Sequence, residues 1–338
     1  MAQHRIYFNR CFTTTSKLIE QMKNNPNKDT FNIIISHSQP NHYLQRHTEH
    51  YEIEPTCSED EYLHYIMHNC MKHDIEMFIP RHRATRLAED AKGLHKIGVK
   101  PMFVATPEIY QLLDNKVKTY EDLALTGIVA IPDAHVVRTI DDFKHAYESI
   151  LSKGSKACLK PISGIGGEGF KRILEMNETE EAFLSSSTAL SKTRLERVLQ
   201  TEGSVSPFMM SEFMEDEEYS IDCLAKDGEL LVAIPRRKVD HYRQNIEYRE
   251  ELIEIAEKIT KRYKLSFLFN IQTKYHKGLP YLVEINTRFS GGMYKSGATG
   301  ANMLYWAIQL LKGEDPQIPN LYWNVQAYDS LEFNMTPI

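Results

Sequence analysis

The chain has 338 residues, of which 42% are hydrophobic and 25% charged, and its formal charge at pH 7 is −6. This composition is typical of a globular protein, and the length predicts two or three packed lobes rather than one core. The negative charge excludes a general nucleic-acid binder, and no apolar run approaches the roughly 18 residues that span a bilayer.

The cysteines and the first residues predict a cytoplasmic protein. The cysteines are odd in number, widely scattered and form no CxxC pair; they are Cys11, Cys57, Cys70, Cys158 and Cys223. Reduced thiols are the simplest explanation, and residues 1–5 open no signal peptide. His64 and His68 would share one helix face at a metal-ligand spacing. A solvated helix in a polar segment explains them more simply.

The first hundred residues alternate short apolar runs with helical patterns. Strands are expected at residues 5–8, 31–35, 75–80 and 101–104, and helices at residues 15–23, 59–72 and 85–97. This alternation implies parallel strands with crossover helices, so we expect a Rossmann-like lobe. No glycine fingerprint follows the first strand, and the lobe is therefore not assigned a dinucleotide.

A second series of elements begins after Thr106-Pro107. A helical stretch is expected to lead to Asp114-Asn115-Lys116, and another helix covers residues 141–153. The latter starts with acidic residues, as the helix dipole prefers. Residues 156–160 and 169–174 are expected to be strands, with a glycine-rich turn between them.

That turn, residues 164–169, matches the pattern GxGxxG. A dinucleotide fingerprint needs a helix directly after the glycines, whereas a strand is expected here. A glycine-rich hairpin tip can instead fold its N–H groups over phosphate oxygens, although a merely flexible hairpin is the alternative. Lys160 places a cation beside the turn, which favours the phosphate interpretation.

The next two motifs suit the nucleoside part of a nucleotide. Residues 209–214, Met-Met-Ser-Glu-Phe-Met, are an apolar strand that runs into a polar stretch. Such an edge can offer a backbone carbonyl and an amide to adenine, but a plain core strand has the same pattern. Glu218 follows, where a carboxylate can accept the ribose hydroxyls; otherwise the acidic cluster 215–218 is a solvated turn.

The most specific signal is a pair of β-rich runs, residues 267–272 and 281–286, joined by a hairpin-type connection. Their period of two puts Asn270 with Gln272, and Glu284 with Asn286, on one face. All four bear oxygen donors, which suit a hard cation that bridges phosphates. Burying such groups unpaired costs a few kcal/mol each, so the pattern predicts a magnesium site.

Together these motifs resemble the ATP-grasp superfamily, specifically its carbamoyl-phosphate-synthase-like branch, over about residues 108–313. A closer resemblance is to the ATP-grasp proteins found with tellurium-resistance operons. The resemblance implies an α/β ATP-grasp fold. It would comprise a Rossmann-like pre-ATP-grasp domain (1–107), an ATP-grasp domain (108–315) and a C-terminal tail (316–338). The ATP-grasp domain would have a mobile lid at about residues 136–210 and a C-terminal metal-binding lobe.

The resemblance also implies roles for individual residues in ATP binding. Lys116 and Lys160 resemble the lysines on the ATP phosphates, Gly166 and Gly167 the lid loop, Glu212 (carbonyl) and Met214 (amide) the adenine hinge, and Glu218 the ribose carboxylate. Ser211 stands where many members have an acidic hinge residue. Adenine recognition would therefore depend more on the backbone.

The implied metal ligands are Gln272, Glu284 and Asn286, and Arg288 resembles the arginine that steadies the transferring phosphoryl group. Most superfamily members have an acid at the position of Gln272, although glutamine is common in the carbamoyl-phosphate-synthase branch. Catalysis, with Lys160 and Arg288 as the catalytic residues, would come from positioning and electrostatic stabilisation, with no side-chain nucleophile.

The implied activity is that of a carboxylate–amine ligase. With ATP and Mg²⁺, or Mn²⁺ in its place, such an enzyme activates a carboxylate as an acyl phosphate, which an amine or a thiol attacks. The alternatives are an enzyme that stops at a carboxyphosphate, acyl-phosphate or kinase-like product, and a non-catalytic nucleotide-binding regulatory protein. The expected partners are small-molecule carboxylate and amine substrates, and a homodimer is compatible with them.

Substrate groups are expected near two arginines and a small-residue loop, namely Arg236, Arg237, Ser290, Gly291 and Gly292. An arginine fork suits a carboxylate. A simple surface-charge role is the alternative for the two arginines.

Overall fold

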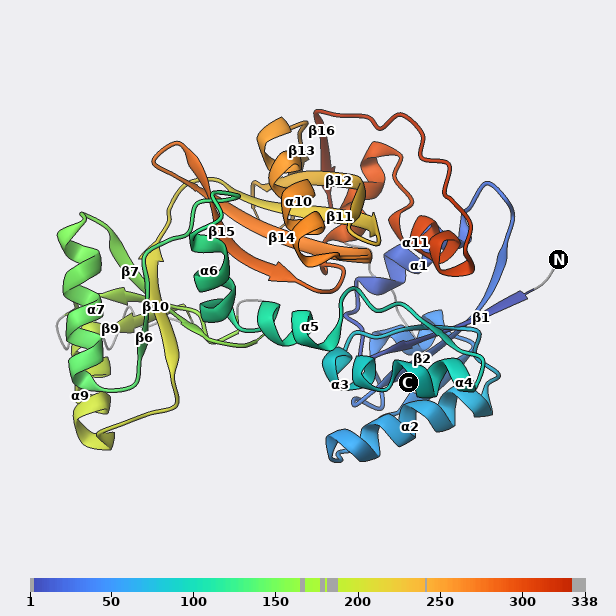
Figure 1. The fold of residues 1–338 in the computed structure, drawn as a ribbon, viewed down its shortest axis with the longest axis horizontal. Coiled ribbons are helices and arrows are strands. Elements are labelled where there is room, and N and C mark those ends of the chain that lie inside the picture. The colour runs from blue at the N-terminus through green and yellow to red at the C-terminus, as the bar shows by residue number, and fades with distance from the viewer. Residues whose placement is uncertain (1–2, 165–167, 177–179, 181–187, 241, 330–338) are drawn as a thin grey trace. The chain divides into compact units, whose positions relative to one another are not determined.

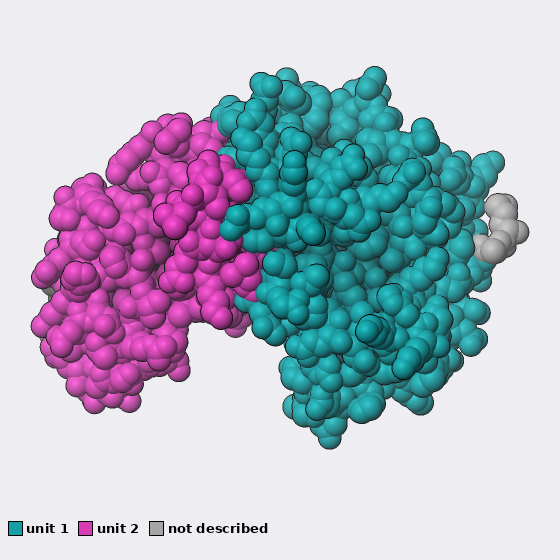
Figure 2. Space-filling view, in the orientation of Figure 1, with its two compact units in different colours: residues 1–111, 219–272, 285–338 teal, residues 112–218, 273–284 magenta. Residues whose placement is uncertain are grey.

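The structure, a computed structural model, describes residues 3–164, 168–176, 180, 188–240 and 242–329. The chain forms two compact units, which Figure 2 shows in different colours. Unit 1 comprises residues 1–111, 219–272 and 285–338, and unit 2 comprises residues 112–218 and 273–284. Among the described residues, no helix is long and apolar enough to cross a membrane.

Unit 1 contains a parallel sheet in the order β3-β2-β1-β4-β5. Its strands are β1 (Gln3–Asn9), β2 (Thr30–His37), β3 (His50–Ile53), β4 (Met77–Ile79) and β5 (Lys100–Pro101). The helices between them are α1 (Thr15–Lys23), α2 (Glu59–Lys72), α3 (Ala84–Glu89) and α4 (Ala91–Lys96), with a 3-10 helix η1 (Tyr43–His47). The predicted Rossmann-like arrangement of parallel strands and crossover helices is confirmed.

The side chains of this sheet alternate between two cores. Tyr7, Ile34 and Phe78 are buried against α2, α3 and α4, which lie together on one side of the sheet (Figure 1). Their neighbours Ile6 and Phe8 point to the opposite core, which includes side chains of α1. Burial on both faces explains why these strands are continuous apolar runs in the sequence.

Three expectations for this lobe are wrong in detail. The helix expected at residues 85–97 is two helices, because Asp90 leaves helical geometry and its carboxylate folds against Gly93, 2.3 Å from where a Cβ would lie. The strand expected at residues 101–104 is instead Lys100–Pro101, and only the Met102 amide continues the pairing, with a hydrogen bond of 2.8 Å to the carbonyl oxygen of Phe78. The partly exposed β3 was missed because it has no apolar run. His64 and His68 are exposed, as expected of a solvated helix face.

The second sheet has the order β15-β14-β11-β12-β13-β16. Its strands are β11 (Glu218–Lys226), β12 (Glu229–Lys238), β13 (Arg243–Ile246), β14 (Phe267–His276), β15 (Leu279–Asn286) and β16 (Val325–Tyr328). Helices α10 (Glu250–Tyr263) and α11 (Met303–Lys312) and the 3-10 helix η2 (Met293–Thr299) accompany it. The chain passes between the two units within β14 and β15, and β16 lies in the segment expected to be a tail.

Unit 2 contains a sheet in the order β6-β10-β7-β8-β9. Its strands are β6 (Ala134–Val137), β7 (Lys156–Pro161), β8 (Lys171–Leu174), β9 (Ala189–Ser191) and β10 (Phe208–Phe213), and its helices include α6 (Lys116–Ala124), α7 (Ile140–Ser152) and α9 (Lys192–Glu202). The chain enters the unit within α5 (Pro107–Leu113). Helices α7 and α9 cover one face of the sheet, where Phe143, Leu159, Leu199 and Met210 form the core (Figure 1).

Candidate nucleotide and metal site

The face of the unit 2 sheet opposite α7 and α9 carries polar and aromatic side chains. Leu159 and Met210 belong to the helix-covered core, so Lys160 on β7 and Phe213 on β10 point to the other face. Arg172 is opposite Cys158 in the register of β7 and β8, and its guanidinium lies 5.5 Å from the centre of the Phe213 ring. This face therefore combines cations with an aromatic ring, as a nucleotide requires.

Lys160 differs from the other cation on β7. Lys156 forms an ion pair of 2.8 Å with Glu215, whereas Lys160 has no hydrogen-bond or ion-pair partner in the part of the chain that the structure describes. A half-buried ammonium group without a protein partner is suited to donate to a phosphate oxygen.

The glycine-rich turn after β7 needs glycine at its ends. Gly169 has a φ of 72°, and a Cβ there would lie 2.6 Å from Cγ of Pro161. Gly164 has a φ of 147°, which side-chain-bearing residues rarely adopt. The absence of a Cβ at Gly169 thus permits its close approach to Pro161, next to Lys160 in the sequence. Gly166 and Gly167, predicted to form the lid loop, lie outside the described residues.

Lys116 lies beside this turn and beside a predicted metal ligand. Asn115 caps α6 by accepting a hydrogen bond from the amide of Lys118, which makes Lys116 the first helical residue. Its Nζ lies 3.5 Å from the carbonyl oxygen of Gly164 and 3.5 Å from Oε2 of Glu284. Both side chains are largely buried, at 12% and 14% exposed.

Tyr120, one helical turn after Lys116, holds β15 against α6. Its hydroxyl group lies 3.1 Å from the carbonyl oxygen of Leu282 and 2.9 Å from that of Val283, directly before Glu284. A buried phenol that bonds to the backbone fixes the strand to the helix. Residues separated by more than 160 positions in the sequence thus meet in unit 2.

The predicted adenine hinge is held by its side chains. Glu212 accepts hydrogen bonds from the amide of Asp133 (3.1 Å) and the hydroxyl of Ser155 (2.8 Å). The carbonyl oxygen of Met214 accepts one from Lys274 (2.8 Å). Ser211, at the position of an acidic residue in many ATP-grasp proteins, lies 3.4 Å from the thiol of Cys158. The same thiol donates to the carbonyl oxygen of Glu212, the expected adenine acceptor, at 3.7 Å.

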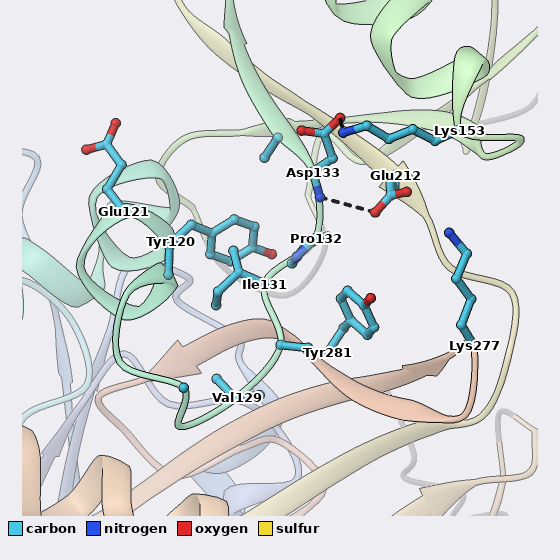
Figure 3. Close-up of a pocket in the computed structure, with 14 residues that line it drawn as sticks. Tyr120, Glu121, Val129, Ile131, Pro132, Asp133, Lys153, Glu212, Lys277 and Tyr281 are labelled. Atoms are coloured by element: carbon cyan, nitrogen blue, oxygen red, sulfur yellow. Dashed lines mark hydrogen bonds and ion pairs between the residues drawn. The ribbon is translucent and has the colours of Figure 1, made fainter.

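A pocket of about 850 Å³ lies on the other side of the hinge. Figure 3 shows Asp133, Lys153, Glu212, Lys277 and Tyr281 among the residues that line it. The carboxylate of Glu212 points to the amide of Asp133, and Lys153 forms an ion pair of 2.7 Å with the Asp133 carboxylate. The side chain of Glu212 leaves β10 on the face opposite Lys160, so this pocket does not lie on the face to which Lys160 points.

The predicted metal ligands are divided between the units: Glu284 belongs to unit 2, and Gln272 and Asn286 belong to unit 1. Glu218, the predicted ribose carboxylate, is the last residue of unit 2 before the chain enters unit 1. In the described part of the chain, no group of three His, Cys, Asp or Glu side chains could hold a metal ion. The predicted set has one acid and two amides, and these oxygen donors fit Mg²⁺ when phosphate oxygens supply the other ligands.

Arg236, predicted near the substrate, is already paired with a carboxylate. It is 1% exposed, and its Nε and Nη2 donate to Asp222 at 2.7 and 3.0 Å. Asp222, with no exposed surface, also accepts hydrogen bonds from Asn270, Ser290 and Ser296. The Arg236–Asp222 pair therefore holds the loop after β15 in place. This role could not be predicted from the sequence, because the pairing of Asp222 with Arg236 is visible only in the fold.

The other predicted substrate residues surround this pair. Arg237 bonds to Glu247 at 2.9 Å. Ser290 accepts a hydrogen bond of 2.9 Å from Nη2 of Arg236. A Cβ at Gly292 would lie 2.8 Å from Nη1 of Arg236, so only glycine permits this approach. The structure thus brings Arg236, Ser290 and Gly292 together within unit 1.

Comparisons with known proteins show what the sequence and the fold resemble. The sequence model of a family described as ATP-grasp in the biosynthetic pathway with Ter operon matches residues 204–330. The large chain of carbamoyl phosphate synthase from Thermoanaerobacter pseudethanolicus is 25% identical over 199 residues, which are 54% of this chain and 17% of that protein. The large chain from Caldanaerobacter subterraneus is 24% identical over 199 residues. The match spans less than a fifth of the length of these relatives.

Solved structures share the fold across both units. An N5-carboxyaminoimidazole synthetase from Staphylococcus aureus has a TM-score of 0.67 at 12% identity, over 96% of this chain and 80% of that one. The biotin carboxylase domain of 2-oxoglutarate carboxylase from Hydrogenobacter thermophilus was solved in complex with MgADP, ADP and bicarbonate. It has a TM-score of 0.65 at 13% identity, over 95% of this chain and 73% of that one. An L-amino acid ligase from Bacillus licheniformis has a TM-score of 0.62 at 14% identity, over 91% of this chain and 74% of that one.

These matches define the fold as ATP-grasp. Over part of its length the chain is similar to the large chain of carbamoyl phosphate synthase and to the ATP-grasp family model, and the resemblance predicted from its motifs is confirmed.

Proposed function

We propose that this protein is an ATP- and Mg²⁺-dependent ligase that activates a carboxylate as an acyl phosphate for attack by an amine; a thiol is the alternative acceptor. The observation that carries the proposal is the meeting of Lys116, the glycine-rich turn and Glu284 in unit 2. A phosphate lysine, a phosphate-binding turn and a metal carboxylate are the parts that phosphoryl transfer needs side by side.

The proposed reaction has two steps. A carboxylate oxygen of the substrate attacks the γ-phosphorus of ATP, and ADP leaves. The amine nitrogen then attacks the carbonyl carbon, a C–N bond forms and a proton is lost. Inorganic phosphate leaves with the former carboxylate oxygen.

The chain's own residues would act by position and charge. Lys116 and Lys160 would neutralise phosphate oxygens, and Arg288 would steady the transferring group. Gln272, Glu284 and Asn286 would hold Mg²⁺, which when bound neutralises the charge on the phosphates. No thiol nucleophile is needed, and burial raises the pKa of Cys223 well above its usual value, which suits a structural residue.

The comparisons support this reaction class at a coarse level. The relatives include a ligase for amino acids and enzymes named for carboxylation and carbamoyl phosphate synthesis. Their names do not agree on one acceptor, so the amine belongs to the proposal. The sequence has all three predicted metal residues and Arg288, which favours an active enzyme over a purely regulatory nucleotide binder.

The proposal is tested by isotope transfer. The purified protein is incubated with Mg-ATP and pooled ¹⁸O-labelled carboxylates, with and without pooled amines, and phosphate and products are analysed by mass spectrometry. A ligase transfers one ¹⁸O to inorganic phosphate and forms an amide in an amine-dependent manner. A phosphorylated product that persists in the presence of amines would instead identify the kinase-like alternative. ATP binding without any turnover across the pools would identify the regulatory one.

A further inference from the structure

Arg81 occupies a position where parallel sheets commonly bind ligands. The order β3-β2-β1-β4-β5 means that the chain leaves β1 toward one edge of the sheet and later continues from β4 toward the other. The carboxyl ends of β1 and β4 are therefore the point at which the strand order reverses, where open parallel sheets commonly bind ligands. Arg81 lies two residues after β4, and Phe12 lies in the loop after β1.

The guanidinium of Arg81 is buried between two aromatic rings. Arg81 is only 7% exposed, and its Cζ lies 4.7 Å from the ring centre of Phe12 and 4.1 Å from that of Phe289. Nη1 donates to the carbonyl oxygen of Phe289 at 2.6 Å. Asn9 fixes the loop by accepting a hydrogen bond of 2.6 Å from the Arg81 amide.

Arg81 has no carboxylate partner in the part of the chain that the structure describes. Its Nε is buried and has no hydrogen-bond acceptor among the described residues. By contrast, Arg236 is paired with Asp222, and Arg83, two residues from Arg81 and also over an aromatic ring, forms an ion pair of 3.1 Å with Glu59. Two rings and one carbonyl group compensate a buried positive charge only in part.

Positive charge accumulates around this position. Burial lowers the pKa of Arg81 to about 10, and the charge of Arg288 acts in the same direction. Phe289 lies in the loop after β15, directly before Ser290, Gly291 and Gly292. A Cβ at Gly291 would lie 3.4 Å from the Phe12 ring. The loops after β1, β4 and β15 thus meet around Arg81, and all three belong to unit 1.

We propose that Arg81 binds the anionic group, a carboxylate or a phosphate, of the small-molecule substrate. A bound anion would accept from the unpaired Nε–H and would provide the missing negative charge. That the bound anion belongs to the substrate rests on the proposed function. The anion site itself does not, because it is defined by Arg81 and its surroundings in unit 1.

The test compares Arg81→Met with Arg83→Met, a matched control from the same loop whose guanidinium already has a carboxylate. Thermal melting is followed in sodium phosphate or sodium succinate against sodium chloride at equal ionic strength. We expect at least one anion to raise the melting temperature of the wild type and of Arg83→Met. Arg81→Met should bind that anion at least tenfold more weakly. Stabilisation by phosphate alone assigns a phosphorylated ligand, and stabilisation by succinate alone assigns a carboxylate.

The melting temperature without anion provides a second readout. Methionine fills the space between the two rings without a buried charge, so Arg81→Met should melt at or above the wild-type temperature. Arg83→Met should melt lower because its guanidinium no longer donates to the carbonyl oxygens of Ser58 and Cys57. A purely structural Arg81 predicts the reverse: Arg81→Met melts lower and keeps the anion response. That result, or a wild type that neither anion stabilises beyond chloride, would overturn the proposal.

If Arg81→Met does not fold, wild-type crystals give the answer. They are soaked in selenate or in 4-bromobenzoate, whose heavy atoms are located by anomalous scattering. An anion within about 4 Å of the Arg81 guanidinium supports the site, since charge-assisted contacts are shorter than this. Absence of an anion there in both soaks refutes it. None of these readouts needs ATP or turnover, so they can fail while the isotope test of the ligase succeeds, and the reverse.

Discussion

The strongest stability prediction concerns Arg236, whose role is either to bind substrate or to hold unit 1 together. Asp222 accepts five hydrogen bonds, two of them from Arg236. Arg236→Met removes the charged donors and leaves a fully buried carboxylate with three neutral ones. Breaking a buried pair in this way costs about 3–5 kcal/mol. For a unit of this size, that loss lowers the melting temperature by about 6–20 °C.

The assay can report on unit 1 alone. Both tryptophans of the chain, Trp306 and Trp323, belong to unit 1, so tryptophan fluorescence follows its unfolding separately from unit 2. Arg237→Met is the matched control, because Arg237 is adjacent in the sequence, pairs with Glu247 and is 27% exposed. A half-exposed pair of this kind contributes only about 0–1 kcal/mol, and the control should melt within a few degrees of the wild type.

A second variant separates charge from shape. Adding Asp222→Asn to Arg236→Met removes the unpaired charge but keeps a side chain that can bond to Asn270, Ser290 and Ser296. We expect the double variant to melt above Arg236→Met. The reasoning is refuted if Arg236→Met melts within about 2 °C of the wild type. In that case the arginine contributes little to the fold, and its proposed role in holding the loop is lost.

Three further predictions concern the nucleotide, the metal and pH. Lys160→Ala should weaken ATP binding in calorimetry at least tenfold, about 1.4 kcal/mol, whereas Lys156→Ala, on the same strand but paired with Glu215, should not. Unchanged affinity in a folded Lys160→Ala would remove that lysine from the site. Glu284→Gln should retain some ATP affinity yet lose Mg²⁺-dependent turnover at least a hundredfold, and Mn²⁺ located away from Glu284 in ATP-soaked crystals would contradict this. Burial, together with Arg10 and Arg83, lowers the pKa of His82 to about 4, below its unfolded value of about 6.5. The unfolded state therefore binds a proton that the folded state does not, and stability falls as pH decreases from about 6.5 to 4. His82→Gln should reduce that loss in fluorescence melts, and an unaltered pH dependence would contradict the assignment.

The N-terminal fold could be predicted because its signal is local. Apolar runs such as residues 31–35 are buried on both faces of a parallel sheet, and this burial is visible in the sequence as continuous hydrophobicity. α1 and α2 have the predicted bounds, since periodicity and the capping Ser58 act within a few residues. The break at Asp90 was not predictable in this way, because it depends on how one side chain folds back onto Gly93.

The site was predictable only where the residues that act together are neighbours in one sequence motif. The glycine-rich turn and Lys160 are neighbours in the sequence, so their joint role could be inferred from strand geometry. The contact of Lys116 with Glu284 could not, because it depends on Tyr120 holding β15 against α6. The family resemblance predicted a role for each of the two residues, but their separation in the sequence does not indicate that they meet.

The arginines of unit 1 show why a charged residue cannot be interpreted from its own position. Arg81, Arg83 and Arg236 are equally plausible anion-binding residues in the sequence, and the arginine pair 236–237 was favoured as a fork. What distinguishes them is the partner: Asp222 occupies Arg236, Glu59 pairs with Arg83, and no described acid pairs with Arg81. A buried arginine that lacks a carboxylate raises the energy of the free protein, and a ligand that supplies the charge recovers it. The two arginines should therefore differ in what their removal changes. Removing Arg236 should mainly destabilise unit 1, whereas removing Arg81 should mainly weaken anion binding, and opposite results for the two would reverse their assigned roles.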